Sequence, residues 1–262
     1  MKNEQLFRFC FGCPPSDFSE TVVITPFLPL RHFKAHCDAG PVFKGRLYSG
    51  FTAVKNGKDI TVVQCGMGDG PAGDAVLLLG CTRARDMVFA GTCGGFNGCG
   101  IGGFIVSEGA FNGEGFSRYY EPDFDMERLL ASGKMMPADP AYTEELTAFL
   151  EGCPDRMAVL DKGFIFTVGS LLAEQRENLL RVREKGFKGI DMELSAVYRA
   201  AAIAGIRAAG FLVVSDIPLV KNMGDGLDPS ERKAFNRGIQ DQARFTLEFA
   251  SLAQDKIAGG RR

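Results

Sequence analysis

Short runs of β-branched residues alternate along the chain with segments of helical periodicity, and this alternation constrains the fold more than any other feature. Six runs have the composition of short buried strands, namely Thr21–Thr25, Ile60–Cys65, Met87–Ala90, Phe104–Ser107, Met157–Leu160 and Gly210–Ser215. Helical spacing is found between or after them, in Pro71–Arg85, Tyr142–Leu150, Leu171–Lys185, Met192–Ala204 and Pro229–Ile257. Such alternation predicts an α/β fold, with a mixed or largely parallel central sheet flanked by helices.

The chain is long enough for one domain with an ample core. Its 262 residues are 45% hydrophobic and 24% charged, which is typical of a globular protein. No internal repeat divides it, so we predict a single domain over residues 1–262, with an N-terminal extension at 1–20 and a loose tail at 259–262. The last helix carries a start signal: Asp228 can cap it, Pro229 suits its first position and Glu231 completes a capping box.

Glycine is the unusual component. The chain has 33 glycines, and ten of them lie between Gly91 and Gly115. Glycine at this density marks backbone that turns tightly or approaches a ligand closely. In α/β sheets, ligands bind in the loops that follow the carboxyl ends of strands. We therefore expect a site at three loops that follow predicted strands, namely Gly66–Gly70, Gly91–Gly95 and Ser215–Pro218.

Composition argues against several classes of site and partner. The only histidines are His32 and His36. Two histidines are too few for most histidine-based catalytic triads and multi-histidine metal sites, so we predict no metal. A net charge of −2 without a Lys/Arg block argues against a nucleic-acid partner, and no apolar run is long enough to predict a membrane span. Eight scattered cysteines and no recognisable export signal favour reduced thiols and a cytoplasmic location.

One glycine pattern suggests a dinucleotide site. Gly68–Gly73 follows a predicted strand, opens a helix and matches G-x-G-x-x-G, but Gly98–Gly103 matches equally well, so the pattern is common in this chain. The acidic residue required at the end of the second strand is replaced by Gly91-Thr92-Cys93. A nicotinamide-dependent oxidoreductase is therefore a disfavoured alternative, and we predict no cofactor.

Three carboxylates stand among apolar residues, namely Asp191, Glu193 and Asp216. An acid at the end of a buried strand is unfavourable unless it is paired or used, and burial raises its pKa toward the range of a general acid. Asp216 could instead cap a helix or turn, and Glu193 could interact with a helix dipole. These alternatives stay open on the residues alone.

Four motifs occur in an order and spacing that resemble the purine nucleoside phosphorylase/nucleosidase superfamily. They are Gly66-Met67-Gly68, Gly91-Thr92-Cys93-Gly94-Gly95, Asp191-Met192-Glu193 at the start of a helix, and Ser215-Asp216. The resemblance covers roughly residues 21 to 250 and is strongest to the hexameric bacterial-type purine phosphorylases. It implies the fold of that family, which is a single α/β domain with a mixed central sheet flanked by helices.

The resemblance also implies roles for residues at the sugar and the base. Asp216 would be the acid that protonates the purine at N7, assisted by Arg232, and its presence argues for a purine-type base. Glu193 would bind the ribose hydroxyls, with Met192 and Met67 lining the sugar. The residues implied to face the base are Phe166, Leu171, Cys93 and Gly94.

The phosphate subsite matches the family less completely. The resemblance implies that Arg31, Thr92 and Gly91 bind phosphate together with Arg46, which would be donated across a subunit interface. Phe89 stands where phosphorylases commonly have another phosphate-binding arginine, and Phe27 replaces a usual glycine. The segment that faces the base also departs, with Gly169 and Leu171 in place of the usual acid and aromatic residue. From these residues alone, Arg31 and Arg46 could equally be solvated surface charges.

The sequence thus predicts a glycosyltransferase of the nucleoside phosphorylase type. It would cleave the N-glycosidic bond of a purine-type nucleoside by phosphorolysis, with inorganic phosphate as co-substrate, giving free base and ribose 1-phosphate. We expect a homo-oligomer, from dimer to hexamer, with the site near a subunit interface. Two alternatives stay open: a hydrolytic nucleosidase that uses water, and a catalytically degenerate nucleoside-binding protein.

Overall fold

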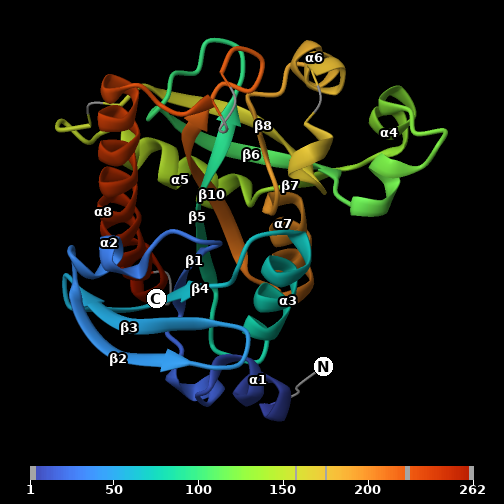
Figure 1. Cartoon of the computed structure of the whole chain (residues 1–262). Coiled ribbons are helices and arrows are strands. Elements are labelled where there is room, and N and C mark those ends of the chain that lie inside the picture. Colours follow the sequence, from blue (N-terminus) through green and yellow to red (C-terminus); the bar gives the residue numbers. More distant parts are fainter. Residues whose placement is uncertain (1–3, 157, 175, 222–224, 260–262) are drawn as a thin grey trace.

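A computed structural model describes residues 4–156, 158–174, 176–221 and 225–259 (Figure 1). Its strands are β1 (Thr21–Thr25), β2 (Asp38–Lys44), β3 (Ser49–Lys55), β4 (Lys58–Gln64), β5 (Asp86–Gly95), β6 (Phe104–Gly113), β7 (Met135–Pro137), β8 (Leu160–Val168), β9 (Gly189–Asp191) and β10 (Arg207–Asp216). Its α-helices are α1 (Glu4–Phe11), α2 (Leu30–Lys34), α3 (Asp69–Leu79), α4 (Met126–Ser132), α5 (Pro140–Glu151), α6 (Arg176–Glu184), α7 (Leu194–Ala204) and α8 (Pro229–Gly259). Short 3-10 turns are η1 (Pro15–Asp17), η2 (Phe116–Tyr120) and η3 (Leu171–Ala173).

Ten strands of the described residues form one mixed sheet in the order β10-β6-β8-β9-β5-β1-β4-β3-β2, with β7 beside β6. Because β5 also pairs with β10, the strands β5, β10, β6, β8 and β9 close into a ring. Parallel pairing of β5 with both β1 and β10 brings their carboxyl ends to one edge. That edge is where a ligand is expected in an α/β fold.

Alternation along the central strands sets the layers of the fold. In β1, Val22 and Ile24 pack into one core cluster, whereas Val23 packs into another on the opposite face. The first cluster includes residues of α3 and α7, and the second includes residues of α5 and α8. Figure 1 shows α8 and α3 on opposite sides of the central strands. The mixed sheet flanked by helices confirms the predicted fold class.

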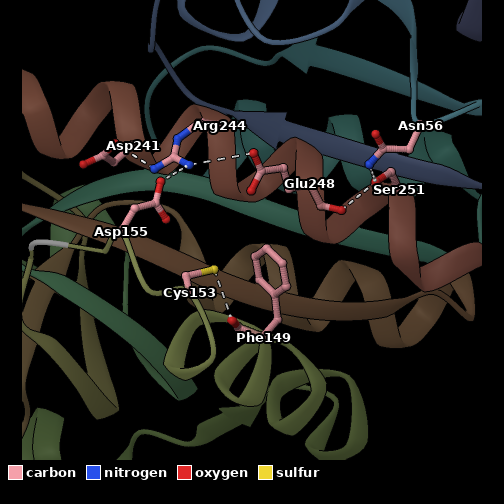
Figure 2. Close-up of polar contacts among 8 residues, drawn as sticks. All are labelled: Asn56, Phe149, Cys153, Asp155, Asp241, Arg244, Glu248 and Ser251. Carbon is pink, nitrogen blue, oxygen red and sulfur yellow. Dashed lines mark hydrogen bonds and ion pairs between the residues drawn. The ribbon is translucent and has the colours of Figure 1, made fainter.

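The last helix is fixed at both its start and its middle. Asp228 Oδ1 accepts hydrogen bonds from the N–H groups of Ser230 and Glu231, and Glu231 in turn accepts the N–H of Asp228, so the predicted capping box is confirmed. Further along α8, Arg244 lies 2.6 Å from a carboxylate oxygen of Asp155 (Figure 2). Near the other end of the helix, the amide of Asn56 donates to Ser251. The start of α8 is therefore held in a defined place next to the sheet edge.

The N-terminal segment packs into the core. Phe7 and Phe11 of α1 are fully buried and form a cluster of rings with Phe18. The part that the sequence analysis set apart as an extension therefore contributes to the core, because its aromatic residues recur at helical spacing. Of the predicted tail, only residue 259 belongs to the described residues, and it ends α8.

The predicted elements are mostly confirmed. β1 has the predicted bounds, and strands occupy four of the other five predicted positions. The run predicted over Met157–Leu160 overlaps β8 only at Leu160, and Met157 lies outside the described residues. The helix predicted over Leu171–Lys185 is wrong at its start, where η3 precedes α6. Leu171 and Leu172 are exposed at a cavity wall, so the apolar residues there do not pack as a helix face.

Two further observations bear on the environment of the chain. All eight cysteines lie in the described part, and each is a free thiol. Among the described residues, no helix combines the length and apolar character needed to cross a membrane.

Candidate active site

A cavity of about 640 Å³ lies at the edge of the sheet where β5 and β10 end. Its walls come from seven places: the segment after β1, the loop after β4, the end of β5, the segment at η3, the segment from β9 into α7, the end of β10, and the start of α8. A volume of this size suits a nucleoside-sized ligand. The lining residues are Phe27, Met67, Thr92, Cys93, Gly94, Leu171, Leu172, Glu174, Ile190, Asp191, Met192, Glu193, Ser215, Asp216, Leu227 and Phe235.

Glu193 is a buried carboxylate that directly precedes α7. Its Oε1 accepts a hydrogen bond of 2.6 Å from the backbone N–H of Gly68. Gly66 and Gly68 have φ values of 86° and 103°, which favour glycine and turn the loop back toward the carboxylate. Burial, together with the negative charge of Asp191, raises the pKa of Glu193 to about 8. The neutral form of Glu193 is therefore favoured in the unliganded site.

Asp191 holds the start of α7 in place. Its Oδ2 accepts hydrogen bonds from the N–H groups of Leu194 (2.7 Å) and Glu193 (3.2 Å), and its Oδ1 accepts one from the Thr167 hydroxyl (2.7 Å). Burial raises the pKa of Asp191 to about 6 even though these donors favour the ionised form. Asp191 therefore caps the helix and fixes the direction in which Glu193 leaves it.

Asp216 lies at the end of β10 and lines the cavity. The pairing of β10 with β5 shifts register between Val214 and Asp216, so Ser215 is the extra residue of a bulge. Bulges re-aim the side chains beside them, and both Ser215 and Asp216 line the cavity. The Ser215 hydroxyl lies 2.7 Å from Oδ1 of Asp216 and 3.1 Å from the carbonyl oxygen of Cys93. The Asp216 carboxylate is thus held in a defined orientation at the carboxyl ends of β5 and β10.

The charged residues of the cavity wall are all acids. They are Glu174, Asp191, Glu193 and Asp216, and no Lys, Arg or His of the described residues lines the cavity. Such a wall accepts hydrogen bonds from hydroxyl and N–H groups, and in its protonated form it can donate a proton. An anionic ligand in the same cavity requires cations that come from outside this wall.

The arrangement of the two best-placed acids has a chemical consequence. Glu193 lies where the loop after β4 meets the start of α7, and Asp216 lies where β10 ends beside β5. A ligand that contacts both residues meets an acceptor for hydroxyl groups at one and an acid at the other. Such a pair can stabilise opposite charges that develop on two parts of one molecule as a bond between them breaks.

Comparison with known proteins agrees with this geometry. The family model described as "Phosphorylase superfamily" matches residues 21–251. The chain belongs to the phosphorylase superfamily.

Relatives and solved structures of this superfamily cover most of the chain. A purine nucleoside phosphorylase DeoD-type 2 from Vibrio cholerae is 27% identical over 249 residues, which cover 90% of this chain and 95% of the relative. A guanosine phosphorylase from Halorubrum lacusprofundi is 27% identical over 213 residues, covering 80% and 83% of the two chains. The crystal structure of a purine nucleoside phosphorylase from Toxoplasma gondii shares the fold, with a TM-score of 0.74, 20% identity and 98% of each chain covered. The family suggested by the four sequence motifs is confirmed.

Most of the predicted site residues are brought together in this superfamily fold. Eight of them line the cavity, although they come from five separate stretches of sequence. The roles assigned to them stay predictions. These eight residues are Met67, Thr92, Cys93, Gly94, Leu171, Met192, Glu193 and Asp216.

Two predicted residues lie in the protein interior instead of the cavity wall. Phe166 is fully buried and packs against Phe111 and Phe187, because its neighbour Thr167 is the residue that points toward Asp191. The carbonyl oxygen of Gly91 accepts a hydrogen bond of 2.8 Å from Gln242 of α8. Neither residue is part of the cavity wall.

The three predicted arginines are exposed and do not line the cavity. Arg31 lies in α2 and Arg46 in the loop between β2 and β3. Arg232 lies in the first turn of α8, where Nη2 is 3.5 Å from the carbonyl oxygen of Leu227, a residue of the cavity wall. Phe89, which replaces an arginine of the family pattern, is fully buried in the core. Within one copy of the chain, none of these arginines reaches the wall.

Sequence reasoning missed several residues of the wall. Glu174 is the only acid among them, and the apolar ones come from η3, from β9 and from the start of α8. The sequence did not single out Glu174 because Gln175-Arg176-Glu177 follows it, and this polar run is typical of the start of a solvent-exposed helix. The apolar residues that were missed are Leu172, Ile190, Leu227 and Phe235.

Proposed function

We propose that the protein cleaves the N-glycosidic bond of a purine-type nucleoside with inorganic phosphate and releases the free base and ribose 1-phosphate. The observation that carries this proposal is the pairing of two buried acids, Glu193 and Asp216, in one cavity of about 640 Å³. The names of the curated relatives, a purine nucleoside phosphorylase and a guanosine phosphorylase, support the same substrate class.

The two acids match the charges that arise in this reaction. A phosphate oxygen attacks C1′ of the ribose as the C1′–N9 bond breaks, and the electrons of that bond leave with the base. Asp216 donates a proton to N7 and so neutralises the leaving base. Glu193 accepts hydrogen bonds from the ribose hydroxyls, and this contact strengthens as positive charge develops on the sugar.

Phosphate binding is best explained by assembly of the chain with itself. Thr92 is a neutral phosphate contact in the wall, and the cations are proposed to come from Arg31 and from Arg46 of a second copy. The loop that carries Arg46 is pinned to α1, since the N–H groups of Arg46 and Leu47 bond to the carbonyl oxygens of Phe9 and Cys10. Phe9 and Leu47 are exposed beside Arg46, by 57% and 61%. An apolar surface around a fixed arginine supports a homo-oligomeric interface.

Hydrolysis is the second candidate. It is favoured because no basic side chain of the described residues lines the cavity. Phe89 fills the core where an arginine of the family pattern would stand, which weakens the phosphate subsite of each single chain. Water needs no cation for binding. The free cysteines support the cytoplasm as the compartment for either reaction.

Release of free base from a panel of purine nucleosides, measured by chromatography with and without phosphate, tests the proposal. We expect base release to require phosphate or arsenate, and ribose 1-phosphate to form in equal amount when phosphate is used. Equal release in phosphate-free buffer would replace phosphorolysis by hydrolysis. Asp216→Asn should lower kcat by about 10²–10³-fold while nucleoside binding is retained. A wild-type protein that binds nucleosides without any turnover would instead be a binding protein.

A further inference from the structure

Glu174 is the one acid of the cavity wall that the proposed reaction leaves without a role. It directly follows η3, whose backbone is fixed by hydrogen bonds from the N–H of Ala173 to Ser170 and from the N–H of Glu174 to Leu171. The hydroxyl groups of Ser170 and Tyr120 lie 2.8 Å apart, and Ala173 is buried in a core cluster. The position of Glu174 is therefore built into the fold and does not depend on a free loop.

The Glu174 side chain is partly buried in the cavity wall. No hydrogen bond or ion pair joins it to any residue in the described ranges, and the apolar side chains of Leu171 and Leu172 precede it in the wall. Burial, together with the negative charge of Asp216, raises the pKa of Glu174 to about 7. Because an acceptor that is partly withdrawn from water without a donor is unfavourable, this position favours a ligand that brings donors.

We propose that Glu174 recognises the N–H groups on the six-membered ring of the base, and so selects bases with an exocyclic amine or a ring N–H over bases that have none. The inference rests on the proposed function, because it assigns the base to the side of the cavity that Asp216 occupies. The same side offers Leu172, Leu227 and Phe235 as apolar cover for the ring faces. Glu174 and Asp216 then contact different edges of one base, with Asp216 at N7.

The chemistry of the two acids differs in what each requires from the base. Asp216 needs an acceptor, N7, which every purine has. Glu174 needs a donor, which adenine, hypoxanthine and guanine carry on the six-membered ring and unsubstituted purine lacks. A site that is built to bond a donor rejects a ligand without one, because its own polar group then stays unpaired.

The test compares Glu174→Leu with the wild-type protein on four nucleosides: adenosine, inosine, guanosine and purine riboside. For whichever donor-bearing nucleoside the wild type cleaves best, Glu174→Leu should lower kcat/KM by about 10–100-fold, mainly through KM. For purine riboside the change should stay below about 3-fold. Glu174→Gln keeps an acceptor oxygen, so its kcat/KM for the donor-bearing nucleoside should lie between those of the wild type and Glu174→Leu. Glu177→Gln, a change at an exposed position of α6 outside the cavity wall, is the matched control and should leave all four substrates unchanged.

Calorimetric binding of the free bases separates this proposal from the proposed function. Adenine, hypoxanthine or guanine should bind Glu174→Leu about 10-fold more weakly than the wild type, whereas purine should bind both alike. If the wild type cleaves no nucleoside but this difference in binding is found, the proposed function fails and the role of Glu174 stands. An equal loss for donor-bearing and donor-free ligands, or no loss for either, would overturn the role of Glu174.

Discussion

Asp191 and Glu193 are buried two residues apart at the start of α7, and their proximity links the site to the stability of the protein. The pKa of Glu193 rises from 4.5 to about 8 on folding, through burial and the charge of Asp191. Between these values the unfolded chain has released the Glu193 proton, whereas the folded protein still holds it. Folding therefore binds a proton, and the free energy of unfolding falls as the pH rises through this range.

Glu193→Gln should remove this part of the pH dependence. Glutamine does not ionise, and its oxygen can still accept the N–H of Gly68. We expect the Tm of the variant to exceed that of the wild type by several degrees at pH 8 and to match it near pH 4.5. Scanning calorimetry across this pH range is the measurement, with Glu177→Gln as the exposed control. A variant that gains no more at pH 8 than at pH 4.5 contradicts a protonated Glu193.

Individual site residues could be predicted from the sequence where an acidic residue lies within an apolar run. Asp191, Glu193 and Asp216 had that signal, and all three line the cavity. Phe166 had no such signal, and alternation along β8 decides its place: Thr167 points to Asp191, so Phe166 faces the core on the other side. Glu174 could not be found because its sequence neighbours are polar, and only the fold brings it near Asp216.

At the scale of elements, the capping box of α8 connects helix stability with the cavity. Leu227 directly precedes the capping residue Asp228, and Phe235 lies two turns into the helix; both side chains line the cavity. Asp228→Ala removes the acceptor for the N–H groups of Ser230 and Glu231, which should reduce the free energy of unfolding by about 1 kcal/mol. We also expect KM for the nucleoside to rise, because the first turn of α8 loosens.

The matched control for this prediction is Asp228→Asn, which keeps a capping oxygen. Chemical denaturation should show a small change for asparagine and a clear decrease for alanine. Steady-state kinetics on both variants then relates the cap to the cavity. If both variants lose the same stability, the charge of Asp228 matters and the cap does not. If KM stays unchanged in Asp228→Ala, the start of α8 does not shape the site.

Elements buried on both faces were predicted well, and exposed or very short ones were not. β1 and the strand at β10 are continuous apolar runs, so their sequence determines them. β2 was missed because Gly40-Pro41 is typical of a turn, and proline is tolerated there only since β2 is an edge strand. β9 spans Gly189–Asp191 and exists through its pairing with β5 and β8, which no local pattern reveals.

At the scale of the whole molecule, the acids and the arginines of the proposed reaction lie in different places. The cavity wall carries four carboxylates, and among the residues that the structure describes no basic side chain joins them. Arg46 is instead exposed to solvent near the exposed apolar residues Phe9, Val42 and Leu47. The two-fold symmetric dimer is the commonest assembly of identical chains, and in such a dimer each chain can supply a residue to the site of the other.

Mixing two inactive variants tests whether Arg46 acts in the site of a second copy. Arg46→Ala and Asp216→Asn should each lack phosphorolysis alone, but a mixed dimer has one site with both native groups. Each mixed dimer has one of its two sites active, so the isolated mixed species should recover about half of the wild-type activity, and an unseparated random mixture, in which half of the dimers are mixed, about a quarter. The variants are co-expressed with different tags, and the mixed species is isolated and sized by light scattering. Arg46→Ala with full activity, or a mixed species as inactive as its parents, would rule out an arginine donated between subunits.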